Sequence, residues 1–251
     1  MNKRLIAERF SKAIHTYPQE SGVQQQIAER MIDLLKRYLP HPSPQQVVEF
    51  GCGTAHYSRL LYQTFQPEKL ILNDLCSDMQ SCCIDLIDKG ATFISGDAEK
   101  LHFPEDTDLL TSCSTLQWFE DPENFFRHSI HYLKQNGYFA FTTFGEENMK
   151  EIRSITDKGL PYRPLQNLEA SLTPFYTIVH SEETICSRSF KSPLHVLRHL
   201  KETGVTGTGL QRWTRRELNH FCEEYIARFG NHASVSLTYH PIYIIAKKKK
   251  S

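Results

Sequence analysis

A short glycine loop and three carboxylates stand where the sequence predicts strands to end. The loop runs from Glu49 to Ala55, and the acidic side chains of Asp74 and Asp97 follow two further apolar runs. In a doubly wound sheet, ligands bind outside the carboxyl ends of the strands, so these residues should meet at one edge. Gly51 and Gly53 would let the backbone approach a ligand closely. Singly, each carboxylate fits a strand-end turn or helix cap better, but together they indicate a ligand site.

The spacing of the loop limits the ligand that it can bind. A dinucleotide-binding loop would continue with glycine where this chain has His56, which disfavours a pyrophosphate and hence a nicotinamide enzyme. A loop this short suits a ligand without phosphates, and Glu49 suits a cationic amino-acid group. Asp74 is placed to bind the two hydroxyls of a ribose, as in both NAD and S-adenosylmethionine sites. Asp97 is placed to accept a hydrogen bond from an adenine amino group.

The elements that must position these residues alternate along the chain. The pattern predicts strands near 47–50, 69–73, 91–95, 108–112 and 137–143, with helices at 55–65, 77–88 and 122–134. Such alternation implies right-handed crossovers and a doubly wound, mainly parallel α/β sheet. Beyond residue 145 we expect a helix to about 158, irregular chain to 174, extended runs at 175–179 and 182–189, helices at 193–203 and 214–229, and a β-rich run at 234–246.

The chain is predicted to form a single domain of 251 residues. Residues 1–45 would form an N-terminal helical cap, split near Tyr17-Pro18 because proline disfavours helix in the residue before it. Residues 46–145 would form a Rossmann-like cofactor-binding core. Residues 146–251 would form a substrate-side half, with a helical lid at about 190–232 inserted before the last strand.

Composition excludes several classes of function. Lysine plus arginine and aspartate plus glutamate balance at 29 each, which removes the bulk electrostatic argument for nucleic-acid binding. No stretch is long and apolar enough for a membrane anchor or a signal, so we expect a cytoplasmic protein. The seven cysteines lack paired spacing and should be free thiols. His195 and His199 share a helical face without the glutamate of a zinc hydrolase, so no metal is expected.

The loop and its carboxylates resemble the cofactor half of the class I methyltransferases, which use S-adenosylmethionine. A narrower resemblance, to the malonyl-carrier-protein methyltransferases of biotin synthesis, rests on segments that span nearly the whole chain. These segments are Phe10 to Ala13 with Tyr17 and Gln24, Leu116 to Trp118, Phe141 to Gly145 with Glu151 to Arg153, Leu197 to Lys201 with Thr203-Gly204, and Ser236 to His240. The loop is specific only to the superfamily, and the combination of the other segments narrows the resemblance to this family.

The resemblance implies that Tyr17 closes over the cofactor, that the loop and Asp74 bind its methionine and ribose parts, and that Asp97 with Ala98 holds adenine. The full set of cofactor residues that it implies is Tyr17, Glu49, Gly51, Cys52, Gly53, Thr54, Asp74, Leu75, Met79, Gly96, Asp97, Ala98, Ser112, Cys113 and Ser114. The chain departs from the common pattern at Ala55, and Cys113 stands where relatives often have asparagine.

For a malonyl thioester the nucleophile would be the free carboxylate, which is ionised near neutral pH and needs no catalytic base. The residues that would position it are Tyr17, Trp118, Arg153 and Arg198, with Arg153 the first candidate to hold the carboxylate and Arg198 the second. The aromatic side chain of Trp118 would line the substrate cavity, or else simply pack.

The implied partner is an acyl carrier protein, which is acidic and should dock on basic side chains. Those in or beside the predicted lid are Arg188, Lys191, Arg198, Lys201, Arg212, Arg215 and Arg216. The alternatives are a methyltransferase of another small carboxylate or hydroxyl, which would share every cofactor residue, and a noncatalytic scaffold of the same fold.

Overall fold

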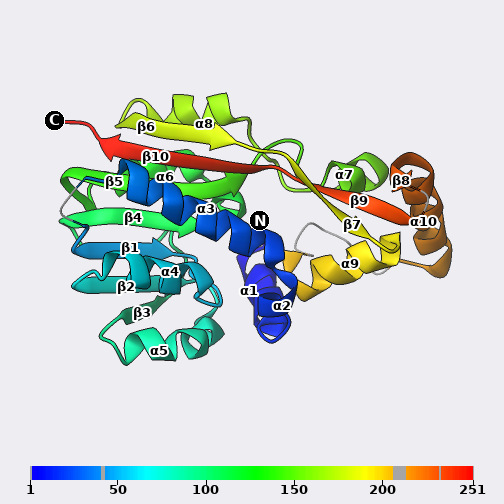
Figure 1. Cartoon of the computed structure of the whole chain (residues 1–251), viewed down its shortest axis with the longest axis horizontal. Helices are drawn as coiled ribbons and strands as arrows, with labels where there is room; N and C mark the ends of the chain where they lie inside the picture. Colours follow the sequence, from blue (N-terminus) through cyan, green and yellow to red (C-terminus); the bar gives the residue numbers. More distant parts are fainter. Residues whose placement is uncertain (1, 41–42, 206–212, 232, 251) are drawn as a thin grey trace.

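The computed structural model of the chain describes residues 2–40, 43–205, 213–231 and 233–250. Its centre is a seven-stranded sheet in the order β3-β2-β1-β4-β5-β10-β6 (Figure 1). The parallel strands are β1 (Gln46–Phe50), β2 (Lys69–Asp74), β3 (Thr92–Ser95), β4 (Thr107–Cys113) and β5 (Leu133–Phe144). Chain order runs outward from β1 in both directions, which makes the gap between β1 and β4 the switch point of the fold.

Helices cover both faces of this sheet because successive strand residues are buried on opposite sides. In β1, Val47 belongs to one apolar cluster and Val48 to the other. The first face is covered by α3 (Gly22–Tyr38), α4 (His56–Phe65) and α5 (Ile84–Ile87), and the second by α6 (Pro122–Ser129) and α8 (Leu165–Leu172). Two buried faces explain why the strands are nearly continuous apolar runs.

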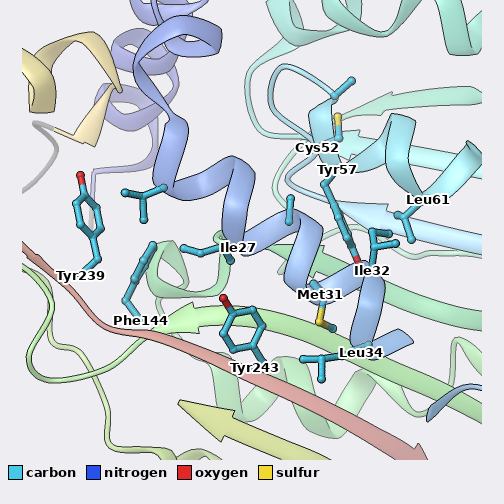
Figure 2. Close-up of a cluster of buried hydrophobic side chains, with 14 of the residues drawn as sticks. Ile27, Met31, Ile32, Leu34, Cys52, Tyr57, Leu61, Phe144, Tyr239 and Tyr243 are labelled. Atoms are coloured by element: carbon cyan, nitrogen blue, oxygen red, sulfur yellow. The ribbon is translucent and has the colours of Figure 1, made fainter. Parts of the chain in front are cut away.

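Helix α3 is the main cover of the first face. Its buried side chains include Ile27 and Met31, which lie with Tyr57 of α4 and Tyr243 of the sheet in one apolar cluster (Figure 2). The Tyr57 hydroxyl is paired inside this cluster with Thr111 Oγ1 at 2.8 Å, so burial leaves it satisfied. The packing fixes α3 across the switch-point side of the sheet, with the two shorter helices α1 (Lys3–Ala13) and α2 (Tyr17–Glu20) ahead of it in the chain.

The lid is connected to the antiparallel end of the main sheet. Strands β6 (Tyr176–Glu183) and β10 (Pro241–Lys248) pair antiparallel, and β10 also pairs antiparallel with β5. Next to them in the chain, β7 (Cys186–Phe190) and β9 (Ser234–Tyr239) join the short β8 (Gly230–Asn231) in a second sheet (Figure 1). Between β7 and β8 come α9 (Pro193–Glu202) and α10 (Arg215–Phe229), which lie with α7 (Lys150–Thr156) at this end of the molecule.

The doubly wound, mainly parallel fold is confirmed, but several predicted bounds were wrong. The segment 165–172, expected to be irregular, forms α8, whose Leu168 and Leu172 pack on the second face. The helix predicted at 77–88 is a 3₁₀ turn, Ser77–Cys83, followed by α5, and that predicted at 122–134 ends at Ser129. The run 234–246 is two strands, because the chain passes from one sheet to the other at His240. No helix among the described residues is long and apolar enough to cross a membrane.

Candidate functional site

The carboxyl ends of β1, β2, β3 and β4 border a cavity of about 1080 Å³ of empty space, its open mouth included. We call it the first cavity. Most of the predicted cofactor residues line it, namely Tyr17, Glu49, Gly51, Cys52, Gly53, Thr54, Asp74, Leu75, Met79, Gly96, Asp97, Ala98, Cys113 and Ser114. This size is sufficient for a nucleoside-sized ligand.

The glycine loop owes its shape to its neighbours. Gly51 adopts a φ of +69°, and a Cβ there would lie 2.2 Å from Thr115 Oγ1, so no larger residue fits. Asp74 holds the next part of the loop, because its carboxylate accepts the Gly53 N–H and the Cys76 N–H, each at 2.8 Å. Asp74 therefore fixes the loop as well as facing the cavity. Burial raises its pKa, and the backbone hydrogen bonds oppose that rise.

Glu49 is the side chain with the clearest need for a ligand. It is 1% exposed, yet its Oε2 has no hydrogen-bond partner. Burial raises the pKa of this carboxyl to about 8, the nearby Ser58 hydroxyl opposes the rise, and the carboxylate of Asp74 adds to it. A cationic group in the cavity would pair with Glu49 and return it to the ionised form, as predicted for an amino-acid ammonium.

The N-terminal helix α1 lies over the other end of the first cavity. Lys3 Nζ forms ion pairs with Asp97 Oδ1 at 3.0 Å and with Glu99 Oε2 at 2.5 Å. The three side chains are 12–18% exposed, so water screens these pairs only in part. Further along α1, Phe10 meets Trp118 edge-on with ring centroids 5.6 Å apart. The helix thus contributes lining residues that the sequence prediction missed.

Tyr17 reaches the cavity from α2, which is fastened to the lid. His199 Nε2 and the Tyr239 hydroxyl lie 2.6 Å apart, and His199 Nδ1 lies 3.5 Å from Glu20 Oε2. Arg188 donates to the Glu20 carbonyl at 3.1 Å. Because Glu20 and Tyr17 share one short helix, the lid and the N-terminal cap hold Tyr17 in place together.

A second cavity, of about 410 Å³, adjoins the first. The two share the lining residues Phe10, Tyr17, Gln24, Ser114 and Trp118. The rest of its wall comes from the chain after β4, the end of β5 and the turn after it, the segment between α7 and α8, and the chain at the end of α9. These residues are Gln117, Phe144, Asn148, Met149, Leu160, Tyr162, Thr203 and Val205. The two cavities therefore meet at Tyr17, Ser114 and Trp118, which line both spaces.

Three predicted residues lie elsewhere. Ser112 is fully buried and donates to the Phe50 carbonyl at 2.7 Å, so it braces β4 against β1 behind the cavity wall. Arg198 is exposed on α9 and lines neither cavity. Arg153 lines neither cavity as well, and its guanidinium lies 5.5 Å from the ring centroid of Tyr162, which does line the second one. Arg153 and Arg198 therefore do not reach the wall, and their predicted contact with a carboxylate stays a prediction.

The residues that the sequence reasoning did not assign come mostly from the N-terminal helices. They are Lys3, Ile6, Phe10, Ser21, Gln24, Gln25 and Ala28, with His56, Tyr57, Asn73, Thr115 and Phe119 from the core. An apolar pair four residues apart, Ile6 and Phe10, was the available signal for a face of α1 turned toward the site.

Burial disfavours the thiolate form of Cys113 beside the site. Burial raises the pKa of Cys113 to about 12, and the Cys52 and Cys83 sulfurs lie 3.9 Å apart in the core. The seven cysteines are all free. Within the described residues, no cluster of histidine, cysteine and carboxylate side chains could hold a metal ion.

A glycine loop at the switch point, a carboxylate after β2 and antiparallel β10 inserted between β5 and β6 define a class I methyltransferase. A family model described as "Methyltransferase domain" matches residues 48–141. The structure is similar to the YcgJ protein of Bacillus subtilis, with a TM-score of 0.63, 16% identity and coverage of 89% of this chain and 100% of that one. It is also similar to phosphoethanolamine N-methyltransferase 2 of Haemonchus contortus, solved with S-adenosyl-L-methionine, with a TM-score of 0.58, 17% identity and coverage of 96% and 57%.

The chain belongs to the malonyl-[acyl-carrier protein] O-methyltransferase family. It is 56% identical to the member from Bacteroides thetaiotaomicron, with 100% of both chains covered. The member from Haemophilus influenzae is 38% identical over 98% of this chain and 95% of its own length. A Bacteroides fragilis relative is 57% identical, and there the chain spans about half, 51%, of the longer protein.

Proposed function

We propose that the protein transfers the methyl group of S-adenosylmethionine to the free carboxylate of malonyl-acyl carrier protein, an early step of biotin synthesis. The observation that carries the proposal is the adjoining pair of cavities, which meet at Tyr17, Ser114 and Trp118. Membership in the family over the full chain supports the choice of substrate. A cytoplasmic location accords with this function and stays a prediction.

The first cavity fits S-adenosylmethionine. Its unpartnered Glu49 carboxyl would take the ammonium group of the methionine part, and Asp74 would take the ribose hydroxyls. Asp97 lies at the end of the cavity nearest α1, where it would face the adenine. The ligand supplies an electrophilic methyl group on a sulfonium and leaves as S-adenosylhomocysteine.

The reaction needs alignment more than proton transfer. A carboxylate oxygen of the malonyl group forms a bond to the methyl carbon as the carbon–sulfur bond breaks, and sulfur keeps the electron pair. The carboxylate is already ionised at neutral pH, so no general base is required. Tyr17 and Trp118 would exclude water and hold the two reactants in line, and alignment of this kind can supply about 7 kcal/mol or more.

The carrier protein would dock beside the second cavity. Thr203 and Val205, in the wall of that cavity, directly follow α9. Helix α9 exposes Arg198 and Lys201, with Lys191 just before it, and Arg215 and Arg216 are exposed at the start of α10. We exclude Arg188 from this surface because it is half-buried and bonded to Glu20. Arg212 lies outside the described residues.

The deciding experiment compares methyl transfer from labelled S-adenosylmethionine to malonyl-acyl carrier protein, malonyl-coenzyme A and free malonate. We expect strong preference for the carrier-bound substrate and a base-labile ester as product. If the cofactor binds and none of the three accepts the label, the substrate assignment is wrong and another small carboxylate or hydroxyl takes its place. If the cofactor does not bind, the protein is a scaffold.

The docking surface has its own test. The double variant Arg198→Glu, Lys201→Glu should raise KM for malonyl-acyl carrier protein about tenfold, because each reversal repels an acidic partner. KM for malonyl-coenzyme A should change much less, since that substrate lacks the carrier's acidic surface. Equal losses with both substrates would show that these residues act on the acyl group or on the fold.

A further inference from the structure

Asn148 lines the second cavity and has a hydrogen-bond donor that no protein group uses. The residue is 1% exposed and lines that cavity, yet its Nδ2 has no hydrogen-bond partner. A buried amide that lacks a partner costs free energy, so such groups in native structures call for an explanation. A bound substrate with an acceptor oxygen would supply the missing partner.

The orientation of this amide is set by the backbone around it. Asn148 Oδ1 accepts the His240 N–H at 3.3 Å, and a flipped amide would turn a donor toward that N–H. The turn that carries Asn148 is pinned on both sides, because the Gly145 N–H donates to the His240 carbonyl at 2.8 Å and the Met149 N–H to the Thr238 carbonyl at 2.8 Å. Nδ2 therefore points away from His240 before any substrate arrives.

The other polar groups of the cavity are also neutral. Gln117 Nε2 donates to the Ser114 carbonyl at 2.6 Å, which fixes a second amide in the wall. Burial raises the pKa of Tyr162 to about 12, so its phenol stays protonated, and the adjacent Asn148 amide opposes that rise without reaching hydrogen-bond geometry. Among the described residues, the lining contains no lysine, arginine, histidine or carboxylate.

A neutral wall suits a carboxylate that must act as a nucleophile. A direct pair with arginine would hold the anion strongly but would also lower its reactivity. An amide donor orients the carboxylate through one hydrogen bond and leaves its charge available. Arg153, which lies over the Tyr162 ring, adds positive potential without contact.

We propose that Asn148 Nδ2 donates a hydrogen bond to the malonyl carboxylate and so selects an acyl group with a free acid. This inference rests on the proposed function and deepens it. It replaces the predicted arginine or lysine contact with a neutral amide, and it assigns Arg153 a supporting electrostatic part.

The test uses Asn148→Asp, which keeps the acceptor for His240 N–H and turns an anionic oxygen toward the cavity. With S-adenosylhomocysteine bound to prevent turnover, affinity for malonyl-acyl carrier protein should fall about a hundredfold, the size expected when a hydrogen bond to a charged group is replaced by repulsion. Affinity for acetyl-acyl carrier protein, which lacks the acid, should stay within about twofold. Asn136→Asp adds the same charge at an exposed position of β5 and serves as the control.

A second variant, Asn148→Ala, separates binding from folding. It should lower kcat/KM for malonyl-acyl carrier protein about tenfold while affinity for S-adenosylhomocysteine is unchanged. Equal losses of affinity for the malonyl and acetyl carriers would show that Asn148 has a structural role and would overturn the inference. Full retention of malonyl-carrier affinity by Asn148→Asp would overturn it as well. Failure of the wild-type protein to methylate any malonyl substrate would instead overturn the proposed function itself.

Discussion

The two adjoining cavities are built on opposite electrostatic plans. The first gathers three carboxylates, Glu49, Asp74 and Asp97, at the ends of parallel strands. The second is walled by neutral amides, hydroxyls and aromatic rings within the described residues. On the proposed function, the former would stabilise a cationic cofactor, and the latter would keep an anionic acyl group out of a tight ion pair. One site would then hold two oppositely charged reactants without lowering the reactivity of the nucleophile.

The largest effect should come from a substitution that distorts the glycine loop of the first cavity. In Gly51→Ala the new methyl group would lie 2.2 Å from Thr115 Oγ1, in a backbone conformation that alanine disfavours. We expect affinity for S-adenosylhomocysteine to fall more than about a hundredfold by calorimetry. Gly90→Ala, also at positive φ but with open space around it, should leave affinity unchanged. Unchanged affinity in Gly51→Ala would mean that the loop can shift away from Thr115 without losing the cofactor site.

The contrast between the cavities also explains which parts of the site could be predicted from the sequence. The strand-end part of the first cavity is encoded by short contiguous segments, so a loop such as Glu49 to Ala55 and a carboxylate such as Asp74 can be placed from the order of residues alone. The mainly parallel sheet could be predicted for the same reason. Ser112, which was also expected at the cofactor, does not line the cavity, because alternation along β4 turns its side chain toward the Phe50 carbonyl.

The second cavity could not be predicted in this way. Its wall is assembled from the three N-terminal helices, the chain after β4, the turn after β5, the segment after α7 and the end of α9, which only the tertiary fold brings together. Asn148 belongs to no strand-end motif, and its role depends on one hydrogen bond from a residue 92 positions away. The helix α8 was missed because its leucines, Leu165, Leu168 and Leu172, recur at helical spacing only over a short segment that is otherwise mostly polar.

Asp74→Asn should have the next largest effect, because one amide oxygen cannot replace both carboxylate oxygens that accept the Gly53 and Cys76 N–H groups. We expect S-adenosylhomocysteine to bind about tenfold to a hundredfold more weakly by calorimetry, and acetyl-acyl carrier protein to bind as before. Asp78→Asn, at an exposed carboxylate that accepts a hydrogen bond from Ser11, is the matched control. Unchanged affinity in Asp74→Asn would remove the carboxylate from the cofactor site.

The pH dependence of ligand binding should distinguish the acidic first cavity from the neutral second cavity. The pKa of Glu49 is raised from 4.5 to about 8 in the ligand-free protein, so the folded state retains a proton that the unfolded chain releases. Glu49 therefore stabilises the fold at low pH, and that contribution declines as pH rises from about 4.5 through 8.

Binding of a cationic amino-acid group should reverse this preference and expel the proton. Affinity for S-adenosylhomocysteine should rise as pH increases from about 6 toward 8, by at most about tenfold per pH unit, and level off above. Glu49→Gln should abolish the rise, and calorimetry in buffers of different ionisation enthalpy should detect no proton release. Malonyl-carrier binding to the neutral second cavity should show no such dependence in this range.

The smallest effect concerns the cover of the first cavity. Lys3→Met removes the part-buried ion pairs with Asp97 and Glu99 while keeping an apolar stem over the site. We expect S-adenosylhomocysteine to dissociate about threefold faster in stopped-flow measurements, because pairs of this kind contribute on the order of 1 kcal/mol or less. Arg4→Met, which breaks an exposed pair with Glu8 on the same helix, should have no effect.

The sign of the Lys3 effect decides what the ion pair does. If α1 holds the cofactor in, loss of the pair frees the helix and only dissociation accelerates. If Lys3 instead competes with the adenine for Asp97, its loss leaves the carboxylate free and affinity rises. Tighter binding would therefore contradict the role of α1 as a cover over the bound cofactor. It would show instead that Lys3 occupies part of the first cavity and that the cofactor must displace it.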